Sequence, residues 1–472
     1  MQSHFQWHLV LAMFAVVASA AYGDTRPDAD SHVSTDSQTL SSSQYAVTSK
    51  LYADGPPSVF GVDAPELAFI GPSPVGFRTL TLVEPAQADV LAMDSNTGKV
   101  PKHDRTLIVD LWYPSVPSSG APPQTYSGSL PSEPPAPPAT FTVPGIAIRD
   151  ARPAGRDYPL IIVSHGYSNA TAAMTWLTEN LASKGYVVAA IRHDDPAITE
   201  TGKFPQLLLR RPLDIAYVAR ALREKLAVEH LIDPEKVALV GYSIGGYGVL
   251  TSAGATLDPT GPLTKMVPAG LLLPYVRGAQ ESGAITVPRL KAVVAISPAG
   301  GGVLGAWGAD GLKDLHAPLL LIAGDHDRTV NYATGARMIF AVASSSTRYL
   351  LTFKGAGHAI GLNVVPPAMR SHLWDEDWFE DPVWRKERLS AINVHFITAF
   401  LDRYVKGDLS RQAYLDVQTP NSDDGVWPQK STSPYSAYSP SDSNITVWKG
   451  FQRNHAAGLQ FLKAAAGEAA AP

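Results

Sequence analysis

From Tyr158 to His358, short and fully apolar runs alternate with amphipathic stretches. Each apolar run has the length of a strand and is rich in Val, Ile and Leu, whereas the intervening stretches have the period of a helix. Strands that are apolar on both faces are buried on both faces, as in parallel sheets whose crossover helices cover either side. The chain is therefore predicted to be an α/β protein with a mostly parallel central sheet and helices on both faces.

The expected elements follow from these patterns. We expect strands over residues 77–83, 105–114, 159–166, 186–194, 236–243, 290–298, 317–327 and, as the final strand, 347–358. We expect helices over residues 171–185, 211–226, 244–255, 335–345 and 387–407. Residues 114–144 are dense in Pro, Ser and Gly and are expected to form either a surface loop or the rim of a cleft, the surface being favoured.

Both ends of the chain differ in composition from its centre. An apolar run from Leu9 to Ala18 with small residues after it is typical of a signal peptide cleaved near residue 20 or 23, and it is too short to span a membrane. We therefore expect a signal peptide over 1–23, a flexible Ser/Pro-rich leader over 24–74, a catalytic domain over 75–407 and a C-terminal extension over 408–472 that ends in an Ala-rich helix. Localisation outside the cytoplasm, secreted or periplasmic, follows.

Composition excludes several classes of site and partner. The 472 residues include no cysteine, so disulfides, thiolate metal sites and cysteine nucleophiles are ruled out. A formal net charge of -5 without basic blocks argues against a nucleic-acid partner. His193, Asp194 and Asp195 are too few and too unsupported to predict a metal centre, and we expect no cofactor and no stable membrane insertion.

The strongest catalytic pattern is G-x-S-x-G at residues 241–245, between the apolar strand KVALV and a predicted helix. This is the setting of a nucleophile elbow, in which a Ser stands on a sharp turn and flanking side chains would collide with the neighbouring elements. Ser243 is therefore the predicted nucleophile.

A serine hydroxyl needs a base to take its proton and an acid to orient that base. His358 follows the last predicted strand in a GAGH turn, where a structural role is hard to assign, and it is the expected base. Asp327, three residues after Gly324, is the expected acid; Asp325 is the alternative, and the carboxylate that is not used would cap the next helix.

The reaction also needs N–H donors for the developing oxyanion. Ile244 opens the helix after the elbow, where the first amides have no intrahelical partner, and supplies one donor. The backbone amide of Tyr167, in the His165–Gly166–Tyr167 turn, is the expected second donor, with His165 holding the loop through a structural hydrogen bond.

Several residues are candidates for the substrate pocket. Trp307, after the strand that ends near Ser297, is expected to contact the substrate, and the group Trp374, Trp378 and Trp384 could line the same pocket, although ordinary packing accounts for at least two of the four. The apolar, Pro-broken segment 254–289 is equally consistent with a lid and with a packed helical excursion.

Together, VDLWYPS, SHGYS, LASKGYVVAAIRHDD, RRPLDI, GYSIGGYG and GAGH resemble the platelet-activating-factor acetylhydrolase and dienelactone-hydrolase-like group of the α/β-hydrolase superfamily, over residues 75–405. The resemblance implies a serine hydrolase of carboxylic esters that works without metal or cofactor, with Ser243, Asp327 and His358 as its triad. The chain lacks the nucleophilic cysteine of true dienelactone hydrolases. HGY with a GxSxGG elbow is also similar to bacterial cutinases and polyester hydrolases, in which the residue matching Tyr167 supplies the oxyanion amide and stacks on the acyl group.

These observations predict a secreted esterase or lipase that acts on small-molecule, lipid or polyester esters through an acyl-enzyme. The elbow is also compatible with a serine peptidase or an acyltransferase, and a non-catalytic binding domain is the alternative from a different functional class.

Overall fold

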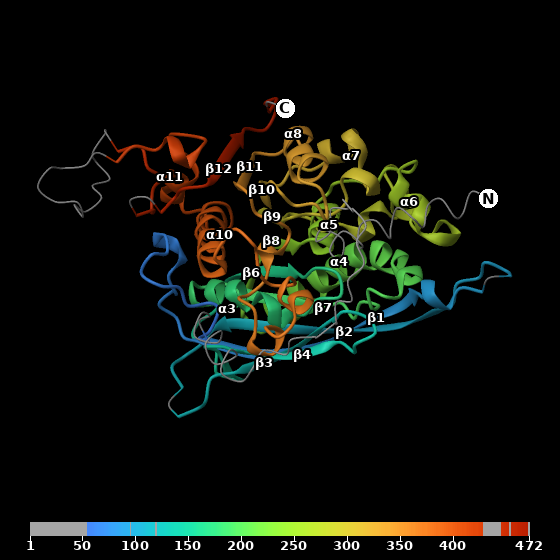
Figure 1. Cartoon of the computed structure of the whole chain (residues 1–472). Coiled ribbons are helices and arrows are strands. Elements are labelled where there is room, and N and C mark those ends of the chain that lie inside the picture. Colours follow the sequence, from blue (N-terminus) through green and yellow to red (C-terminus); the bar gives the residue numbers. More distant parts are fainter. Residues whose placement is uncertain (1–53, 95, 119, 428–444, 453–454, 471–472) are drawn as a thin grey trace, which may run out of the picture.

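The computed structural model describes residues 54–94, 96–118, 120–427, 445–452 and 455–470. Its centre is a ten-stranded sheet in the order β12-β11-β10-β9-β8-β6-β7-β2-β1-β5 (Figure 1). The pairs from β11 to β7 are parallel, and antiparallel pairing joins β12 to β11, β7 to β2 and β2 to β1. The predicted mostly parallel sheet is confirmed.

The strands of the main sheet are β1 Val75–Ala88, β2 Lys102–Pro114, β5 Ile148–Arg149, β6 Tyr158–Ser164, β7 Val187–Arg192, β8 Ile232–Tyr242, β9 Ala292–Ile296, β10 Leu319–Gly324, β11 Arg348–Phe353 and β12 Leu459–Ala464. The helices are α3 Thr175–Ser183, α4 Pro205–Val228, α5 Ile244–Ser252, α6 Pro262–Met266, α7 Gly308–Lys313, α8 Met338–Val342, α9 Leu373–Glu376, α10 Lys386–Leu401 and α11 Gln412–Leu415.

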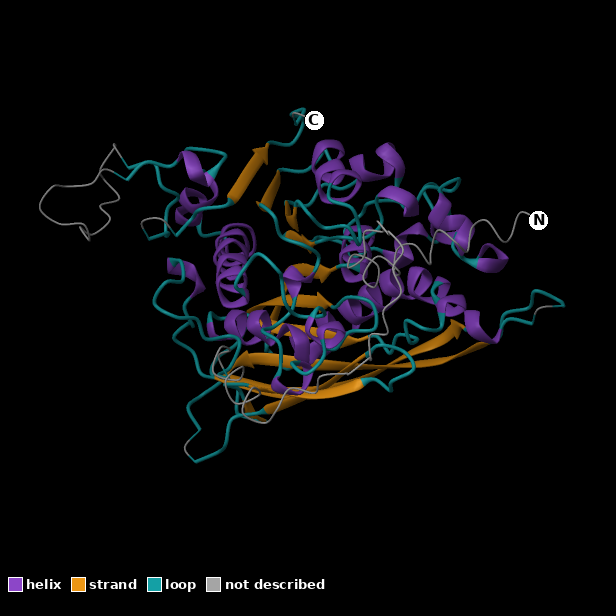
Figure 2. Ribbon diagram, in the orientation of Figure 1, coloured by secondary structure: helices purple, strands orange, loops and turns teal. Residues whose placement is uncertain are grey.

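Helices cover both faces of the sheet (Figure 2). On β6, Ile161 and Val163 face a core built with α3 and α10, whereas Leu160 and Ile162 face a second core built with α4 and α5. This alternation explains why the strand is apolar at every position. Within the described residues, no helix is long and apolar enough to span a membrane.

The N-terminal boundary of packed structure lies before the predicted residue 75. The predicted signal peptide and most of the predicted leader lie outside the described residues, but residues 54–74 pack against the domain. Ser58 is buried and donates to Glu179 Oε2 at 2.7 Å, and the amide of Leu67 donates to His395 Nδ1 at 3.2 Å. The composition of this segment predicted a flexible leader because it contains few apolar residues. Those few residues, together with the hydrogen bonds above, are enough to pack it against the domain.

The Pro-rich segment 114–144 contains a hairpin, where a loop was expected. Its strands are β3 Thr125–Leu130 and β4 Ala139–Pro144, and they form a separate two-stranded sheet. Tyr126 and Phe141 are buried, and the ring of Phe141 meets that of Phe379 edge-on. Every second side chain or so of each strand is buried, which stabilises the hairpin. The surrounding prolines made this alternation hard to recognise in the sequence.

The C-terminal region contradicts the prediction of a terminal Ala-rich helix. Leu459–Ala464 instead form β12, which pairs antiparallel with β11 at the edge of the sheet, so 347–358 does not contain the final strand. The extension from residue 408 therefore completes the central sheet. The burial of Leu459 and Phe461 outweighs the helix propensity of the alanines.

The segment 254–289 forms α6 and short 3₁₀ turns that pack beside α4. Leu263, Leu272 and Ile285 are buried in the core on the α4 and α5 side, and Arg220 of α4 donates to Ala284 O at 3.2 Å. No residue of this segment lines the cavity described below. In this structure the segment is therefore a packed helical excursion beside α4.

Candidate active site

Ser243 lies on the sharp turn between β8 and α5. Its φ of 56° and ψ of -119° place it in a strained region of backbone space for a residue with a side chain. The flanking glycines permit this turn: a Cβ at Gly245 would lie 2.1 Å from Ser164 O, and one at Gly241 would lie 2.3 Å from Gly245 O. The turn presents the Ser243 hydroxyl at the carboxyl end of the sheet.

The structure brings Ser243, His358 and Asp327 into one chain of hydrogen bonds. Ser243 Oγ lies 3.0 Å from His358 Nε2, and His358 Nδ1 lies 2.8 Å from Asp327 Oδ2. Because the carboxylate can only accept, Nδ1 carries the proton and Nε2 is left to accept from the serine. Burial opposes ionisation of Asp327, but the neighbouring His358 and backbone donors hold the pKa of the carboxyl below its usual value.

Asp325, the alternative acid, points elsewhere. Its Oδ1 accepts from the amide of Gly355 at 2.6 Å and lies 2.7 Å from Nδ1 of the exposed His326. Asp327 Oδ1 also accepts from the amides of Thr329 at 3.0 Å and Val330 at 3.2 Å. Its second oxygen is thereby directed to His358.

Side chains from three elements fix the turn that carries His358. The carbonyls of residues 358 to 361 accept hydrogen bonds in succession from Tyr242 Oη, Lys386 Nζ, Asn393 Nδ2 and Trp176 Nε1. Burial lowers the pKa of Lys386 to about 8. Sequence analysis missed these four donors because each is distant from His358 in the chain and belongs to no local motif.

The two predicted oxyanion donors lie in segments that flank Ser243. Ile244 is the first residue of α5. Tyr167 lies in the turn after β6, where a Cβ on the adjacent Gly166 would lie 3.4 Å from Ser243 Cβ. His165 Nδ1 lies 2.7 Å from Gly166 O, which is the structural hydrogen bond expected of it.

A cavity that is open to solvent lies over Ser243. Its lining residues are Gly166, Tyr167, Asn169, Ile198, Tyr242, Ser243, Thr329, His358, Ala359, Trp374, Asp377 and Trp378. Two of the predicted tryptophans, Trp374 and Trp378, therefore belong to the pocket. Sequence analysis missed Asn169, Ile198, Thr329 and Asp377 because they lie in loops without a pattern of their own.

The prediction that Trp307 contacts the substrate is wrong. Trp307 is buried below α5, where its Nε1 donates to Thr251 Oγ1 at 2.9 Å and its ring packs 5.9 Å from that of Tyr247. Trp384 is also a packing residue, and its Nε1 donates to Lys354 O at 2.8 Å. The amphipathic tryptophan side chain satisfies its N–H within the core at both positions.

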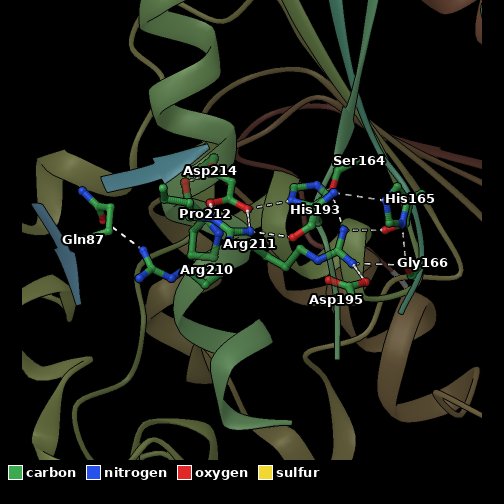
Figure 3. Close-up of polar contacts among 12 residues, drawn as sticks. Gln87, Ser164, His165, Gly166, His193, Asp195, Arg210, Arg211, Pro212 and Asp214 are labelled. Carbon is green, nitrogen blue, oxygen red and sulfur yellow. Dashed lines mark hydrogen bonds and ion pairs between the residues drawn. The ribbon is translucent and has the colours of Figure 1, made fainter. Parts of the chain in front are cut away.

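A second Ser–His–Asp chain lies beside His165 and Gly166, the residues that precede Tyr167 (Figure 3). Ser164 Oγ lies 2.9 Å from His193 Nε2, and His193 Nδ1 lies 2.9 Å from Asp214 Oδ2. All three side chains are buried, and Arg105 donates to both carboxylate oxygens of Asp214. None of the three lines the cavity.

Electrostatics also distinguish this second chain from the first. Burial and the charge of Arg211 lower the pKa of His193 to about 3. Burial alone would raise the pKa of Asp214, but Arg105 and the hydrogen bond from His193 lower it to about 2. A histidine with so low a pKa is a poor general base near neutral pH. In the part of the chain that the structure describes, no three acidic or histidine side chains are grouped as metal ligands would be.

Comparison with known proteins agrees with this architecture. A family model described as "PET hydrolase-like" matches residues 147–264, which include Tyr167, Ser243 and Ile244. Cutinase est2 of Thermobifida alba is 24% identical over 203 residues, which cover 43% of this chain and 53% of that protein. Cutinase cut1 of Thermobifida fusca is 24% identical over 203 residues, covering 43% and 50%. The chain thus spans about half the length of the curated relatives it matches.

A solved structure of a ferulic acid esterase from Streptomyces cinnamoneus aligns with a TM-score of 0.47 and 21% sequence identity, over 71% of this chain and 91% of that one. The strand order, the elbow and the family match give the protein an α/β-hydrolase fold, as predicted, with similarity to cutinases and polyester hydrolases.

Proposed function

We propose that this protein hydrolyses carboxylic esters through an acyl-enzyme on Ser243. The observation that carries the proposal is the hydrogen-bonded chain Asp327–His358–Ser243 at the floor of an open cavity. The cutinases and the PET hydrolase-like family model agree with ester chemistry at such a site.

In the first half of the reaction, Ser243 Oγ adds to the ester carbonyl carbon while its proton passes to His358 Nε2. The carbonyl electrons move to the oxygen, and the amides of Ile244 and Tyr167 stabilise that oxyanion. When the intermediate collapses, the bond to the alcohol breaks and His358 returns the proton to the leaving oxygen. Asp327 stabilises the imidazolium throughout this half-reaction.

In the second half, His358 takes a proton from water, and the resulting hydroxide adds to the acyl carbon. Collapse of this intermediate breaks the bond to Ser243 Oγ, which recovers the proton from His358 and releases the carboxylic acid. Apart from the ester and one water molecule, these steps use only groups of the chain.

The lining of the cavity supports an ester with an apolar or aromatic acyl group. Trp374, Trp378 and Tyr167 present aromatic surface to the cavity, and Ile198 adds an aliphatic side chain. Small-molecule, lipid and polyester esters all contain such groups, and the names of the cutinase relatives favour the last two.

The test is hydrolysis of p-nitrophenyl acetate, butyrate and octanoate by the wild type and by Ser243→Ala. Loss of a catalytic serine reduces kcat by about 10⁴-fold or more. A fluorophosphonate probe should label Ser243 in the wild type, as mapped by peptide mass spectrometry. Turnover that survives S243A, or labelling of the buried Ser164 instead, would contradict the proposal. A wild type without turnover or labelling would favour the non-catalytic binding domain.

We also propose that the enzyme acts outside the cytoplasm, in the periplasm or the medium. The apolar run Leu9–Ala18 supports this proposal, although it lies outside the described residues. The mature N-terminus, measured by mass spectrometry, should lie near residue 21 or 24. Recovery of a chain that retains Met1 from the native host would contradict export.

A further inference from the structure

Arg211 of α4 lies directly beneath the turn that carries Tyr167. Its side chain is fully buried (0% exposed), and its guanidinium contacts the backbone of that turn at His165 and Gly166 (Figure 3). Nη1 donates to His165 O at 2.9 Å and Nη2 donates to Gly166 O at 3.1 Å. A planar guanidinium thus fixes two successive carbonyls at once, which is a geometry that a lysine cannot reproduce.

The contact with Gly166 O acts on the amide of Tyr167 through the peptide bond. The Gly166 carbonyl and the Tyr167 N–H belong to the same planar unit, and in a trans peptide they point in opposite directions. When Arg211 holds the oxygen on the buried side of the turn, it therefore directs the N–H to the other side. A charged donor on the carbonyl also polarises the peptide and strengthens its N–H as a donor.

A second group fixes the far end of the same turn. Asp195 forms a buried ion pair with Arg211, and its Oδ2 accepts from the amide of Ser168 at 2.9 Å. Ser168 has a φ of 49°, a left-handed conformation that serine rarely adopts. The ion pair therefore holds the backbone on both sides of Tyr167 in a conformation that the turn would not keep by itself.

His165 is a second donor to the carbonyl of Gly166. A carbonyl oxygen can only accept, so the contact between His165 Nδ1 and Gly166 O requires the proton on Nδ1. Complete burial and the charge of Arg211 lower the pKa of His165 well below its usual value, which keeps the ring neutral. Gly166 O thus receives two donors, one charged and one neutral.

We propose that Arg211 is a positioning residue for the oxyanion hole: with Asp195 it orients and polarises the Gly166–Tyr167 peptide so that the Tyr167 amide meets the developing oxyanion. The inference rests on the ester hydrolysis proposed above. It gives the second, buried Ser164–His193–Asp214 chain a role as support for this ion pair, since Arg211 Nη1 also lies 3.3 Å from Ser164 Oγ.

The adjacent arginine provides a matched control. Arg210 is also buried on α4, but its guanidinium points away from the turn and donates to Gln87 Oε1 at 3.1 Å and to Ala88 O (Figure 3). Arg210→Met and Arg211→Met remove the same side chain from neighbouring positions of one helix. Only Arg211→Met removes contacts with the turn that carries Tyr167.

The experiment combines ester kinetics with a trifluoromethyl ketone inhibitor. Ser243 Oγ adds to the ketone carbon, its proton passes to His358, and the carbonyl electrons form an oxyanion where the ester intermediate would have its own. We expect R211M to lower kcat by about 10 to 100-fold with KM within about threefold, because one oxyanion donor is worth about 10²–10³-fold in turnover. The inhibitor affinity should fall by the same factor as kcat/KM, whereas R210M should leave both within about twofold.

Arg211→Lys covers the case in which R211M does not fold. It keeps a charge beside Asp195 but loses the two-carbonyl fork, and we expect kcat and inhibitor affinity to fall in parallel by about 10-fold. The proposal is overturned if a cooperatively unfolding Arg211 variant matches R210M in both measurements, if only KM changes, or if both Arg211 variants fail to unfold cooperatively. A wild type that neither hydrolyses esters nor binds the ketone would instead remove the proposed function, and this inference with it.

Discussion

At the scale of single residues, surroundings decide which of two similar constellations can do chemistry. Ser243 and Ser164 each lie within 3.0 Å of a histidine nitrogen whose other nitrogen faces an aspartate. Ser243 faces an open cavity, whereas Ser164 is fully buried. In the second set, Arg105 forms an ion pair with Asp214, and Arg211 donates a hydrogen bond to Ser164 Oγ. We therefore propose that identical residue types serve catalysis in one place and support the backbone in the other.

The acid of the proposed triad can be tested with two neighbouring aspartates. We expect Asp327→Asn to lower kcat by about 10³–10⁴-fold, since the amide cannot stabilise the imidazolium and favours the wrong tautomer of His358. Asp325→Asn is the matched control and should change kcat by less than about threefold, because its contacts are with Gly355 and His326. Steady-state kinetics with p-nitrophenyl butyrate measures both. A larger loss in D325N than in D327N would reassign the acid.

The sequence predicted a functional residue where that residue belongs to a recognisable local motif. Ser243 and His358 each end a strand in a recognisable turn, and the structure places them 3.0 Å apart. Trp307 was misjudged because a tryptophan after a strand can turn toward the pocket or toward the core, and only packing decides. Arg211 and Lys386 could not be assigned, since their targets are backbone carbonyls of distant segments.

At the scale of elements, the confirmed parts of the fold are those with a local sequence pattern, and the missed parts are those set by contacts distant in the chain. The buried parallel strands and their helices were predictable because nearly every position of each strand meets a core. Strand β12 was missed because its six residues run into an alanine-rich stretch whose local preference is helical. Its position is set by pairing with β11, which is distant in the chain.

The contribution of β12 can be measured at Phe461. Its ring stacks on Phe396 of α10 at a centroid distance of 4.6 Å and on Tyr349 of β11 at 5.7 Å. Phe461→Ala should lower the free energy of unfolding by about 3–5 kcal/mol, measured by urea denaturation. Gln460→Ala, whose side chain is half-buried and donates to Asn421 at 3.2 Å, should cost less than about 1 kcal/mol. Equal effects of the two substitutions would mean that β12 adds little to the core.

At the scale of the whole molecule, α10 joins the two ends of the described chain. The amide of Leu67 donates to His395 Nδ1, and the rings of Phe451 and Tyr414 pack on the same imidazole. The segment around residue 67 and the C-terminal region therefore both contact one buried side chain. In a chain without disulfides, such contacts are what fixes the ends to the domain.

His395 makes this junction sensitive to acid. Burial and the charge of Lys184 lower the pKa of its imidazole from 6.5 to about 3. Between these two values the unfolded chain binds a proton that the folded chain does not, so the stability that the neutral imidazole contributes is lost as pH falls through this window. His193, with a pKa also lowered to about 3, adds a loss of the same sign.

We therefore expect the free energy of unfolding of the wild type to fall steeply between pH 7 and pH 4.5. His395→Asn can keep an acceptor for the Leu67 amide but does not titrate, so it should lose about 2 kcal/mol less than the wild type over this interval, even though the smaller side chain lowers its stability at pH 7. The matched control is His372→Asn on the exposed surface, which should follow the wild-type pH profile. Urea denaturation at the two pH values measures the difference. If H395N and the wild type lost the same free energy, the acid sensitivity would have to originate elsewhere, with His193 the next residue to replace.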